Sequence, residues 1–156
     1  RSVVFSPDGT RLASGGIDRT VVIWDLAKAE RTLTLDGYDD GIRSLAYSPD
    51  GARLAVAAGG RSVVILDAHT GGILSSPADR DRRITAIAYS PGGELLAAGT
   101  RDGRVRLLDP RDGRLRFLID GHDGGITDLA FRPDGKRLVT SCSEGAAKIW
   151  NLGGRY

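Results

Sequence analysis

Few residues in this 156-residue chain are of the types that bind metals or attack substrates. The chain contains two histidines, His69 and His122, and a single cysteine, Cys142. This set is too small for a zinc site of ordinary Cys/His composition, and one cysteine allows no internal disulfide. Asp39 and Asp40 lack the spacing of a calcium loop, and no glycine pair precedes a helical pattern that would cradle phosphate. We therefore expect no metal site, no cofactor and no catalytic centre.

The composition is that of an ordinary globular chain. Hydrophobic residues make up 40%, charged residues make up 27%, and the formal net charge is +2. Arginine outnumbers lysine 19 to 3, which we interpret as the sign of a bacterial chain. Acidic residues are interspersed among the arginines, which favours a solvated surface over a nucleic-acid stripe. No apolar run approaches the roughly 18 residues of a membrane helix, so we expect no membrane partner and a reducing, cytoplasmic setting.

The sequence is a tandem repeat with a period of 42 residues. The motif Ser-Pro-Asp-Gly starts at Ser6 and Ser48, and it returns in altered form at Ser90 and Arg132. Other columns keep the same register, among them Leu12, Leu54, Leu96 and Leu138. Periods of this length are typical of architectures in which each repeat stacks on its neighbour.

Each repeat is predicted to hold four short strands joined by tight turns. The first strand precedes the Pro-Asp-Gly turn, where proline presets φ and glycine tolerates a positive φ. A second strand follows, then a third at 20–24 and 104–108, and a fourth at 31–35, 72–75 and 114–118. Such a unit is an antiparallel meander that must stack on its neighbours to bury both faces. An immunoglobulin-like sandwich also has regularly spaced strands, but it gives no reason for a strict repeat.

The repeats resemble WD40 repeats. The Trp-Asp pair of that family stands at Trp24-Asp25, and its Gly-His pair stands at Gly121-His122. The resemblance implies an all-β fold of four WD40-type β-propeller blades, each a four-stranded antiparallel meander, with the last outer strand missing. The predicted blades cover about 1–36, 37–78, 79–120 and 121–156. Because WD40 propellers most often close at about seven blades, we expect a fragment of a larger propeller.

The resemblance also implies a buried hydrogen-bonded network of histidine, Ser/Thr, aspartate and tryptophan in each blade. Carried over by position, the network residues present are His122, Thr140, Glu144, Trp150, Ser14, Asp18, Trp24 and Asp102. Glu144 stands where the family has aspartate, and the second blade keeps no member. A His/Thr/acid set looks superficially like a catalytic relay, but these residue types also satisfy one another inside a fold. We therefore expect a structural role for His122.

By resemblance, the chain is expected to be a non-catalytic scaffold that binds protein partners, within a larger regulatory or signalling protein. The loops leading into each first strand and those joining the second and third strands are predicted to share one rim. The side chains predicted to bind a partner on this rim are Tyr38, Asp40, Arg43, Arg82, Arg83 and Arg101. Loops suit this role because they vary while strands maintain the packing.

Two further interpretations stay open at this point. In the first, the chain is a self-assembling half-propeller, and two copies form an eight-bladed ring by homodimerisation. An open arc favours this because it exposes strand edges and apolar blade faces. In the second, the arginines between 101 and 116 bind RNA. Neighbouring aspartates dilute that cluster and few aromatic residues are available for base stacking, so we expect no nucleic-acid partner.

Overall fold

The computed structural model describes residues 1–58, 63–76 and 84–153, and within those ranges it contains strands and turns but no helix. Four antiparallel sheets follow one another along the chain, and we call each sheet a blade. Blade 1 holds β1 (Ser2–Phe5), β2 (Arg11–Gly15), β3 (Val21–Asp25) and β4 (Glu30–Leu35). Blade 2 holds β5 (Ile42–Tyr47), β6 (Arg53–Ala58), β7 (Val63–Asp67) and β8 (Ile73–Ser75).

The other two blades repeat this plan. Blade 3 holds β9 (Ile84–Tyr89), β10 (Leu96–Thr100), β11 (Arg104–Leu108) and β12 (Leu115–Asp120). Blade 4 holds β13 (Ile126–Phe131), β14 (Arg137–Cys142) and β15 (Ala147–Asn151). The predicted all-β fold of meander blades, with three strands in the fourth, is confirmed. In the described ranges, no helix has the length and apolar character needed to cross a membrane.

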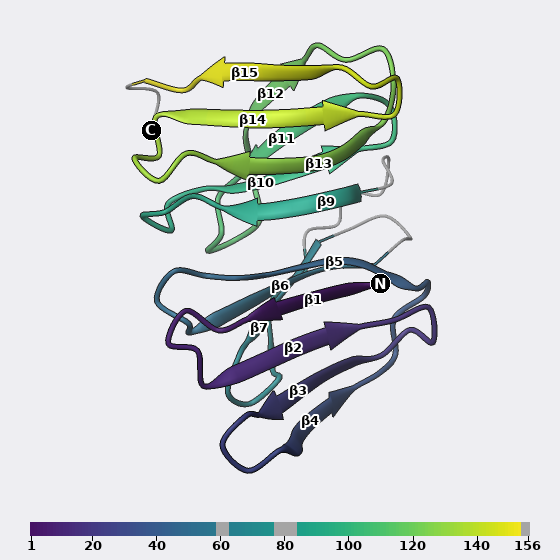
Figure 1. Cartoon of the computed structure of the whole chain (residues 1–156), viewed down its shortest axis with the longest axis vertical. Coiled ribbons are helices and arrows are strands. Elements are labelled where there is room, and N and C mark those ends of the chain that lie inside the picture. Colours follow the sequence, from purple (N-terminus) through teal and green to yellow (C-terminus); the bar gives the residue numbers. More distant parts are fainter. Residues whose placement is uncertain (59–62, 77–83, 154–156) are drawn as a thin grey trace.

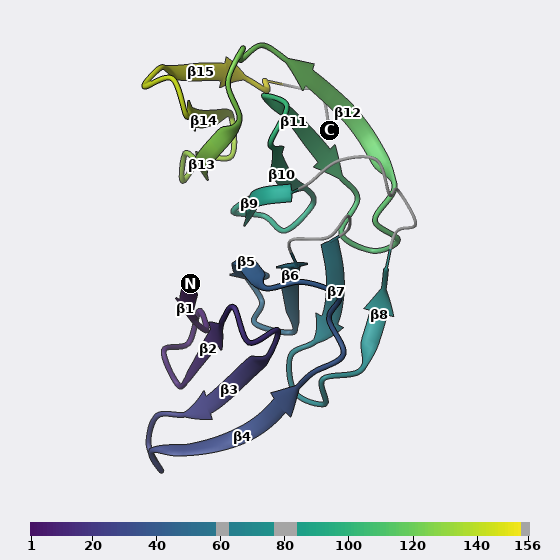
Figure 2. The same ribbon diagram turned by 90° about the vertical axis from the view of Figure 1, so that its right-hand side faces the viewer.

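The four blades fan out as an arc (Figures 1 and 2). In every blade the strands pair in chain order, so the first and last strands form its two edges. Figure 2 shows the first strands β1, β5, β9 and β13 on the inside of the arc and β4, β8 and β12 on the outside. Neighbouring inner strands contact one another, which places successive blades face to face.

The turn between the first two strands fixes the register of each blade. Its glycine has a positive φ in all four repeats, for example 69° at Gly9 and 70° at Gly51, as the motif predicts. The Ser6 hydroxyl donates to the Asp8 carboxylate at 2.6 Å, and Thr10 N donates to the same carboxylate at 3.0 Å. These bonds lower the pKa of Asp8 to about 2, and the bond from Ser6 has the largest effect. Local hydrogen bonds to the charged Asp8 carboxylate therefore stabilise the turn.

The hydrophobic core is divided into three layers, one between each pair of neighbouring blades. Side chains alternate along the strands, so each blade contributes one face to the layer before it and one to the layer after it. Ile23 from blade 1 packs with Leu54 and Val56 from blade 2 in the first layer. Leu107 from blade 3 packs with Leu138 from blade 4 in the third. The arc is thus held together mainly by apolar blade-to-blade contacts.

Two kinds of hydrogen bond recur between neighbouring blades. Backbone N–H groups donate to an inner-strand serine of the preceding blade, in the pairs Leu45 N to Ser2 Oγ at 3.0 Å and Ile87 N to Ser44 Oγ at 3.1 Å. Arginines donate to a carbonyl of the following blade, in the pairs Arg11 Nη1 to Ala68 O at 3.2 Å and Arg53 Nη1 to Pro110 O at 3.3 Å. Blade 3 has Ala86 and Leu95 at these two positions, so neither side-chain bond recurs toward blade 4.

Candidate functional site

Blade 4 contains a hydrogen-bonded trio on the face that packs against blade 3. Thr140 Oγ1 accepts a 2.8 Å hydrogen bond from Trp150 Nε1 and lies 2.8 Å from His122 Nε2. Thr140 is 0% exposed and His122 is 6% exposed. The His122 and Trp150 rings meet edge to face with their centroids 6.2 Å apart. The structure therefore brings together three of the four predicted network residues of this blade.

Glu144, expected as the acid of this network, does not join it. Its exposed side chain lies against Gly124, and His122 Nδ1 is buried without a hydrogen-bond partner among the described residues. A glutamate carboxylate sits one bond further from the backbone than an aspartate carboxylate, and here it extends to the surface. Burial, followed by the nearby Lys148 charge, lowers the pKa of His122 below its ordinary value of 6.5. The lowered pKa favours the neutral imidazole, which can share a hydrogen bond with the Thr140 hydroxyl inside the fold, and the structural role of His122 stays a prediction.

Blade 1 holds half of the same network. Trp24 Nε1 donates to Ser14 Oγ at 3.0 Å, which repeats the bond between tryptophan and hydroxyl of blade 4. Asp18 is exposed and accepts a 3.0 Å hydrogen bond from the Thr20 hydroxyl within its own turn. The Arg31 guanidinium lies 5.1 Å from the Trp24 ring centroid, a distance at which cation–π attraction acts. Asp18 thus stabilises a turn and does not extend the Trp24 network.

Asp102 in blade 3 also acts within its own turn. It accepts a 2.5 Å hydrogen bond from the Thr100 hydroxyl and forms an ion pair with Arg104 at 3.6 Å. The Thr100 hydroxyl in turn accepts from Arg104 N at 3.1 Å, so these side chains tie together the two ends of the turn between β10 and β11. The predicted acids of blades 1 and 3 therefore shape the loops of the rim.

One rim of the arc is built from two kinds of loop that stack on each other. Between blades 1 and 2 and between blades 3 and 4, the loop leading into the first strand lies against the loop between the second and third strands of the preceding blade. Ile42 N donates to Gly16 O at 2.8 Å, and His122 N donates to Gly103 O at 3.3 Å. Backbone hydrogen bonds hold these loops in place, so their side chains are available for other contacts.

Exposed side chains on this rim differ in chemistry from blade to blade. Asp40 and Arg101, both predicted rim residues, are exposed. Ile17, in the loop between β2 and β3, is 69% exposed and was missed by the sequence analysis. Its signal was an apolar residue within the polar turn Gly-Gly-Ile-Asp-Arg. The rim therefore presents an apolar side chain and charges of both signs.

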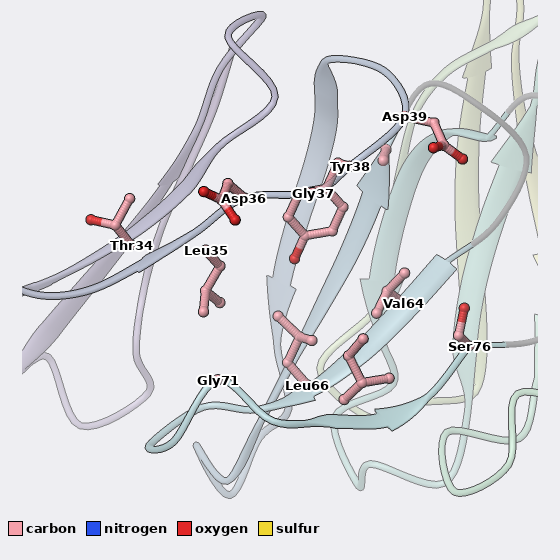
Figure 3. A pocket seen from close by; sticks show the side chains of 12 residues that line it. Thr34, Leu35, Asp36, Gly37, Tyr38, Asp39, Val64, Leu66, Gly71 and Ser76 are labelled. Carbon is pink, nitrogen blue, oxygen red and sulfur yellow. The ribbon is translucent and has the colours of Figure 1, made fainter.

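Two other predicted rim residues, Tyr38 and Arg43, are half-buried. Tyr38 is half-buried and points into a cavity between blades 1 and 2 (Figure 3), and burial raises its pKa to about 12. Arg43 is half-buried, and its Nε is buried without a hydrogen-bond partner in the described ranges. Arg82 and Arg83 lie outside the described residues. The Tyr38 ring faces the interior because its position in the repeat is that of His122, and its predicted role in partner binding stays a prediction.

Comparison with known proteins agrees with this architecture. The family described as nucleolar protein 10-like, N-terminal domain, a β-propeller, matches residues 39–154. The WD domain, G-beta repeat, matches residues 1–25. The chain belongs to the WD40 β-propeller family. The resemblance inferred from the Trp-Asp and Gly-His pairs is thereby confirmed.

Shorter stretches are similar to curated WD40 relatives. The general transcriptional corepressor TUP1 of Saccharomyces cerevisiae is 46% identical over 44 residues, which is 28% of this chain and 6% of TUP1. The probable serine/threonine-protein kinase PkwA of Thermomonospora curvata is 40% identical over 43 residues, again 28% and 6% of the two chains. Protein Mut11 of Chlamydomonas reinhardtii is 58% identical over 33 residues, or 21% and 9%. This chain therefore matches a small part of the length of each relative.

The two end blades of this WD40 arc expose side chains that the inner blades bury. Phe5 is 61% exposed in blade 1, whereas Tyr47 at the same repeat position is 8% exposed. Ile149 is 67% exposed in blade 4, whereas Ile65 at its position is 1% exposed. Each end face therefore has the composition of a blade-to-blade interface.

Proposed function

We propose that this chain is a non-catalytic scaffold that binds protein partners on the rim of stacked loops. WD40 propellers in general serve as protein-interaction scaffolds, and the matched family supports that role here. The observation that carries the proposal is the construction of the rim. Backbone hydrogen bonds fix the loops, while exposed side chains such as Ile17, Asp40 and Arg101 extend from them. Loops held on a rigid scaffold are suited to recognition.

Arginines of blade 3 are the proposed contact for an acidic partner segment. Arg101 is exposed in the loop between β10 and β11, and Arg82 and Arg83 immediately precede β9 in the sequence. Guanidinium groups bind carboxylates through paired hydrogen bonds of fixed geometry, which makes arginine selective for acidic side chains. Arginine is also enriched among the residues that dominate binding energy at interfaces.

A capture experiment tests the rim. Replacing Arg82, Arg83 and Arg101 together with alanine should reduce partner capture from a lysate by roughly tenfold, because three charged contacts are lost. The matched control replaces Arg111 and Arg114, which are exposed in the loop between β11 and β12 on the opposite rim. Equal capture by the rim variant and the control, with circular dichroism unchanged, would exclude this contact.

We also propose that the chain is part of a regulatory protein and that it is located in the cytoplasm. TUP1 is named as a transcriptional corepressor and PkwA as a kinase, and both names describe regulatory proteins. We propose a cytoplasmic location, whereas the description of the matched family names a nucleolar protein. Imaging a fluorescent fusion of the chain in eukaryotic cells distinguishes the two locations. The bacterial origin inferred from the arginine excess stays a prediction.

Self-assembly into an eight-bladed ring is the second candidate function, and the end faces favour it. Val3 and Phe5 on blade 1 and Val139 and Ile149 on blade 4 are between 39% and 67% exposed. In addition, Arg137 holds the position from which Arg11 and Arg53 donate to the following blade, and Arg137 is exposed. We propose that blade 4 of one copy packs on blade 1 of another. Arg137 would then donate a hydrogen bond to the backbone carbonyl at the equivalent position of that blade 1.

Light scattering tests this assembly. The chain should scatter with twice its 16.5 kDa mass, and Ile149→Asp should abolish the dimer because a charge cannot be buried in the joint. Leu74→Asp, on the outer strand β8 and away from both end faces, is the control and should leave the dimer intact. A monodisperse wild-type monomer that unfolds cooperatively would contradict self-assembly and leave the rim proposal unaffected.

A further inference from the structure

A cavity of about 410 Å³ opens between blades 1 and 2, near the outer strands β4 and β8 (Figure 3). One wall is the end of β4 and the segment that leads to β5, and the other is β7 with the turn and strand that follow it. Leu35, Val64, Leu66 and Ile73 supply its apolar lining. Sites that enclose small ligands or single large side chains begin at roughly 300 Å³. The cavity is therefore large enough to accept an apolar anchor.

The cavity exists because blade 2 has small side chains where blade 4 has large ones. Leu66 holds the repeat position of Trp150, and Val64 holds that of Lys148. In blade 4, the Trp150 ring lies against Gly121, and Lys148 Nζ donates to Gly121 O. The space left beside Trp150 measures about 160 Å³. Blade 2 therefore keeps open a volume that the same repeat fills elsewhere.

Tyr38 adds a phenol hydroxyl to a cavity that Thr34 and Ser76 also line. It replaces the histidine of the repeat, and its ring points from the segment after β4 toward the side chains of β7 (Figure 3). Its phenol is neutral at neutral pH and can either donate or accept a hydrogen bond, and burial raises its pKa further, to about 12. A bound group with a backbone amide or carbonyl near this hydroxyl would satisfy it.

Two carboxylates stand beside the cavity without a counter-charge among the described residues. Asp36 and Asp39 both line it, and both are exposed. The equivalent of Asp36 in blade 3 is Asp120, which forms an ion pair with Arg104 at 3.3 Å. Thr20 occupies the position of Arg104 in blade 1, so Asp36 lacks this arginine. The cavity is consequently flanked by negative charge that attracts a basic ligand.

The outer strand beside the cavity is apolar and unpaired on one side. β8 is the edge strand of its sheet, and Ile73 and Leu74 are 70% and 52% exposed. The corresponding residues of blade 1, Arg31 and Thr32, are polar. An exposed edge strand can pair with an added extended segment through backbone hydrogen bonds. This feature favours a peptide over a small molecule.

We propose that this cavity binds a short extended peptide in which one large apolar side chain is flanked by lysine or arginine. The apolar side chain fills the space beside Leu66, the basic groups pair with Asp36 and Asp39, and the peptide backbone runs along β8. An acidic peptide is excluded because its charges repel the same two carboxylates. Asp39 belongs to the same loop as the rim residue Asp40, but the cavity includes none of Arg82, Arg83 and Arg101, so its ligand does not depend on the acidic partner proposed for those arginines.

Fluorescence anisotropy with the intact chain and three labelled peptides tests the proposal. The probe is a Lys-Lys-Phe-Leu-Lys-Lys peptide, and its two controls replace either all lysines with glutamate or Phe-Leu with Ser-Ser. The probe should bind at least about tenfold more tightly than either control, because each control lacks one of the two required features. Arg101→Ala should leave this binding unchanged, which separates the cavity from the rim.

Variants of the protein locate the binding. Leu66→Trp combined with Val56→Thr refills the cavity with the tryptophan and hydroxyl that blade 4 has at these positions, and it should weaken binding by about tenfold or more. Asp39→Asn should weaken binding about two- to fivefold, the effect of one exposed ion pair. Asp123→Asn changes the same repeat position beside blade 4 and should have no effect.

Two results would overturn the proposal. One is equal binding of the basic and acidic peptides. The other is undiminished binding by the refilled variant when its circular dichroism spectrum matches that of the wild type. If the refilled variant does not fold, the comparison of Asp39→Asn with Asp123→Asn decides, and equal binding by these two variants excludes the cavity as the site.

Discussion

Blades 2 and 4 are built on the same repeat, but different side chains fill the equivalent space between each of them and the preceding blade. Blade 4 places a hydrogen-bonded trio there, composed of His122, Thr140 and Trp150. Blade 2 has at the same positions Tyr38, Val56 and Leu66. Replacing both partners of a buried hydrogen bond with apolar groups can be nearly neutral, whereas removing one partner is costly. The polar network is therefore an optional part of the blade, provided that it is replaced as a unit.

Strand pairing in the two blades is the same despite this difference. Leu54 pairs with Leu66 in blade 2, and Leu138 pairs with Trp150 in blade 4, at the same point of the β-ladder. Leu54 and Leu138 are both fully buried. The backbone geometry of a blade thus depends on the shared apolar column and the turn, while the network and the cavity are local variations on it.

Removing the tryptophan of blade 4 should have the largest effect. Trp150→Ala should lower the free energy of unfolding by about 3 kcal/mol, the lower end of the range for a core tryptophan because Trp150 is half-buried. Leu66→Ala, its match in blade 2, should cost about 2 kcal/mol, because Leu66 already borders space that solvent can enter. Urea denaturation followed by far-UV circular dichroism measures both. A larger loss for Leu66→Ala would show that blade 2 is the more tightly packed.

Breaking the trio at its centre should have a smaller effect. Thr140→Val leaves the Trp150 N–H and His122 without their shared partner and should cost about 1–3 kcal/mol. Adding Trp150→Leu to this variant removes both partners of the bond between tryptophan and threonine, as in blade 2, so the cost of the double variant should be less than the sum of the two single costs. A double-mutant cycle in urea measures this coupling. Strictly additive costs would contradict the view that the network is replaced as a unit.

Acid should weaken blade 4 through His122. The pKa of His122 is lowered in the folded state and returns to about 6.5 in the unfolded chain. Below pH 6.5 the unfolded state therefore binds more protons, and the free energy of unfolding falls by up to about 1.4 kcal/mol per pH unit until the folded pKa is reached. His122→Gln should remove this part of the slope, and His69→Gln, in an exposed turn, should keep it. Equal slopes in both variants would contradict burial as the cause.

The smallest expected effect concerns the turns of the two blades. Ser48 donates to Asp50 in blade 2, and this bond is the main cause of the lowered pKa of Asp50. Blade 4 has Arg132 in place of the serine, paired with Asp134 at 3.4 Å. Ser48→Ala should raise the pKa of Asp50 toward 3.8, measured by NMR titration, and should cost less than about 1 kcal/mol because Asp50 is exposed. An unchanged pKa would exclude the Ser48 hydroxyl as its cause.

Structural features that form within a single repeat could be predicted from the sequence. The turn is Pro-Asp-Gly in three repeats and Pro-Gly-Gly in the third, and its last glycine adopts the positive φ that the motif requires in all four. The pairing of Trp24 with Ser14 and of Trp150 with Thr140 follows from the WD40 resemblance, carried over by repeat position. These features depend on residues that lie within one blade and are close in sequence.

Features that depend on the fit between two blades could not be predicted in this way. Glu144 was assigned to the network by position, but one additional methylene group changes where its carboxylate lies. Tyr38 was assigned to the rim because tyrosine is common at interfaces, but the space that accepts its ring is set by small residues of blade 2, such as Val64 and Leu66. The size of a cavity depends on the volumes of side chains from two neighbouring blades. It therefore cannot be predicted from any single position in the sequence.

The hydrogen bonds between neighbouring blades have a consequence for how this chain folds. They join residues 43 or 57 positions apart, and this separation is fixed by the repeat. Relative contact order therefore falls as blades are added, and folding need not slow with length as it does when distant segments must meet. Blades 2 and 3 each have two neighbours, so folding should nucleate there and spread outward. Hydrogen exchange should accordingly be slowest in β6 and β10 and fastest in the two end blades.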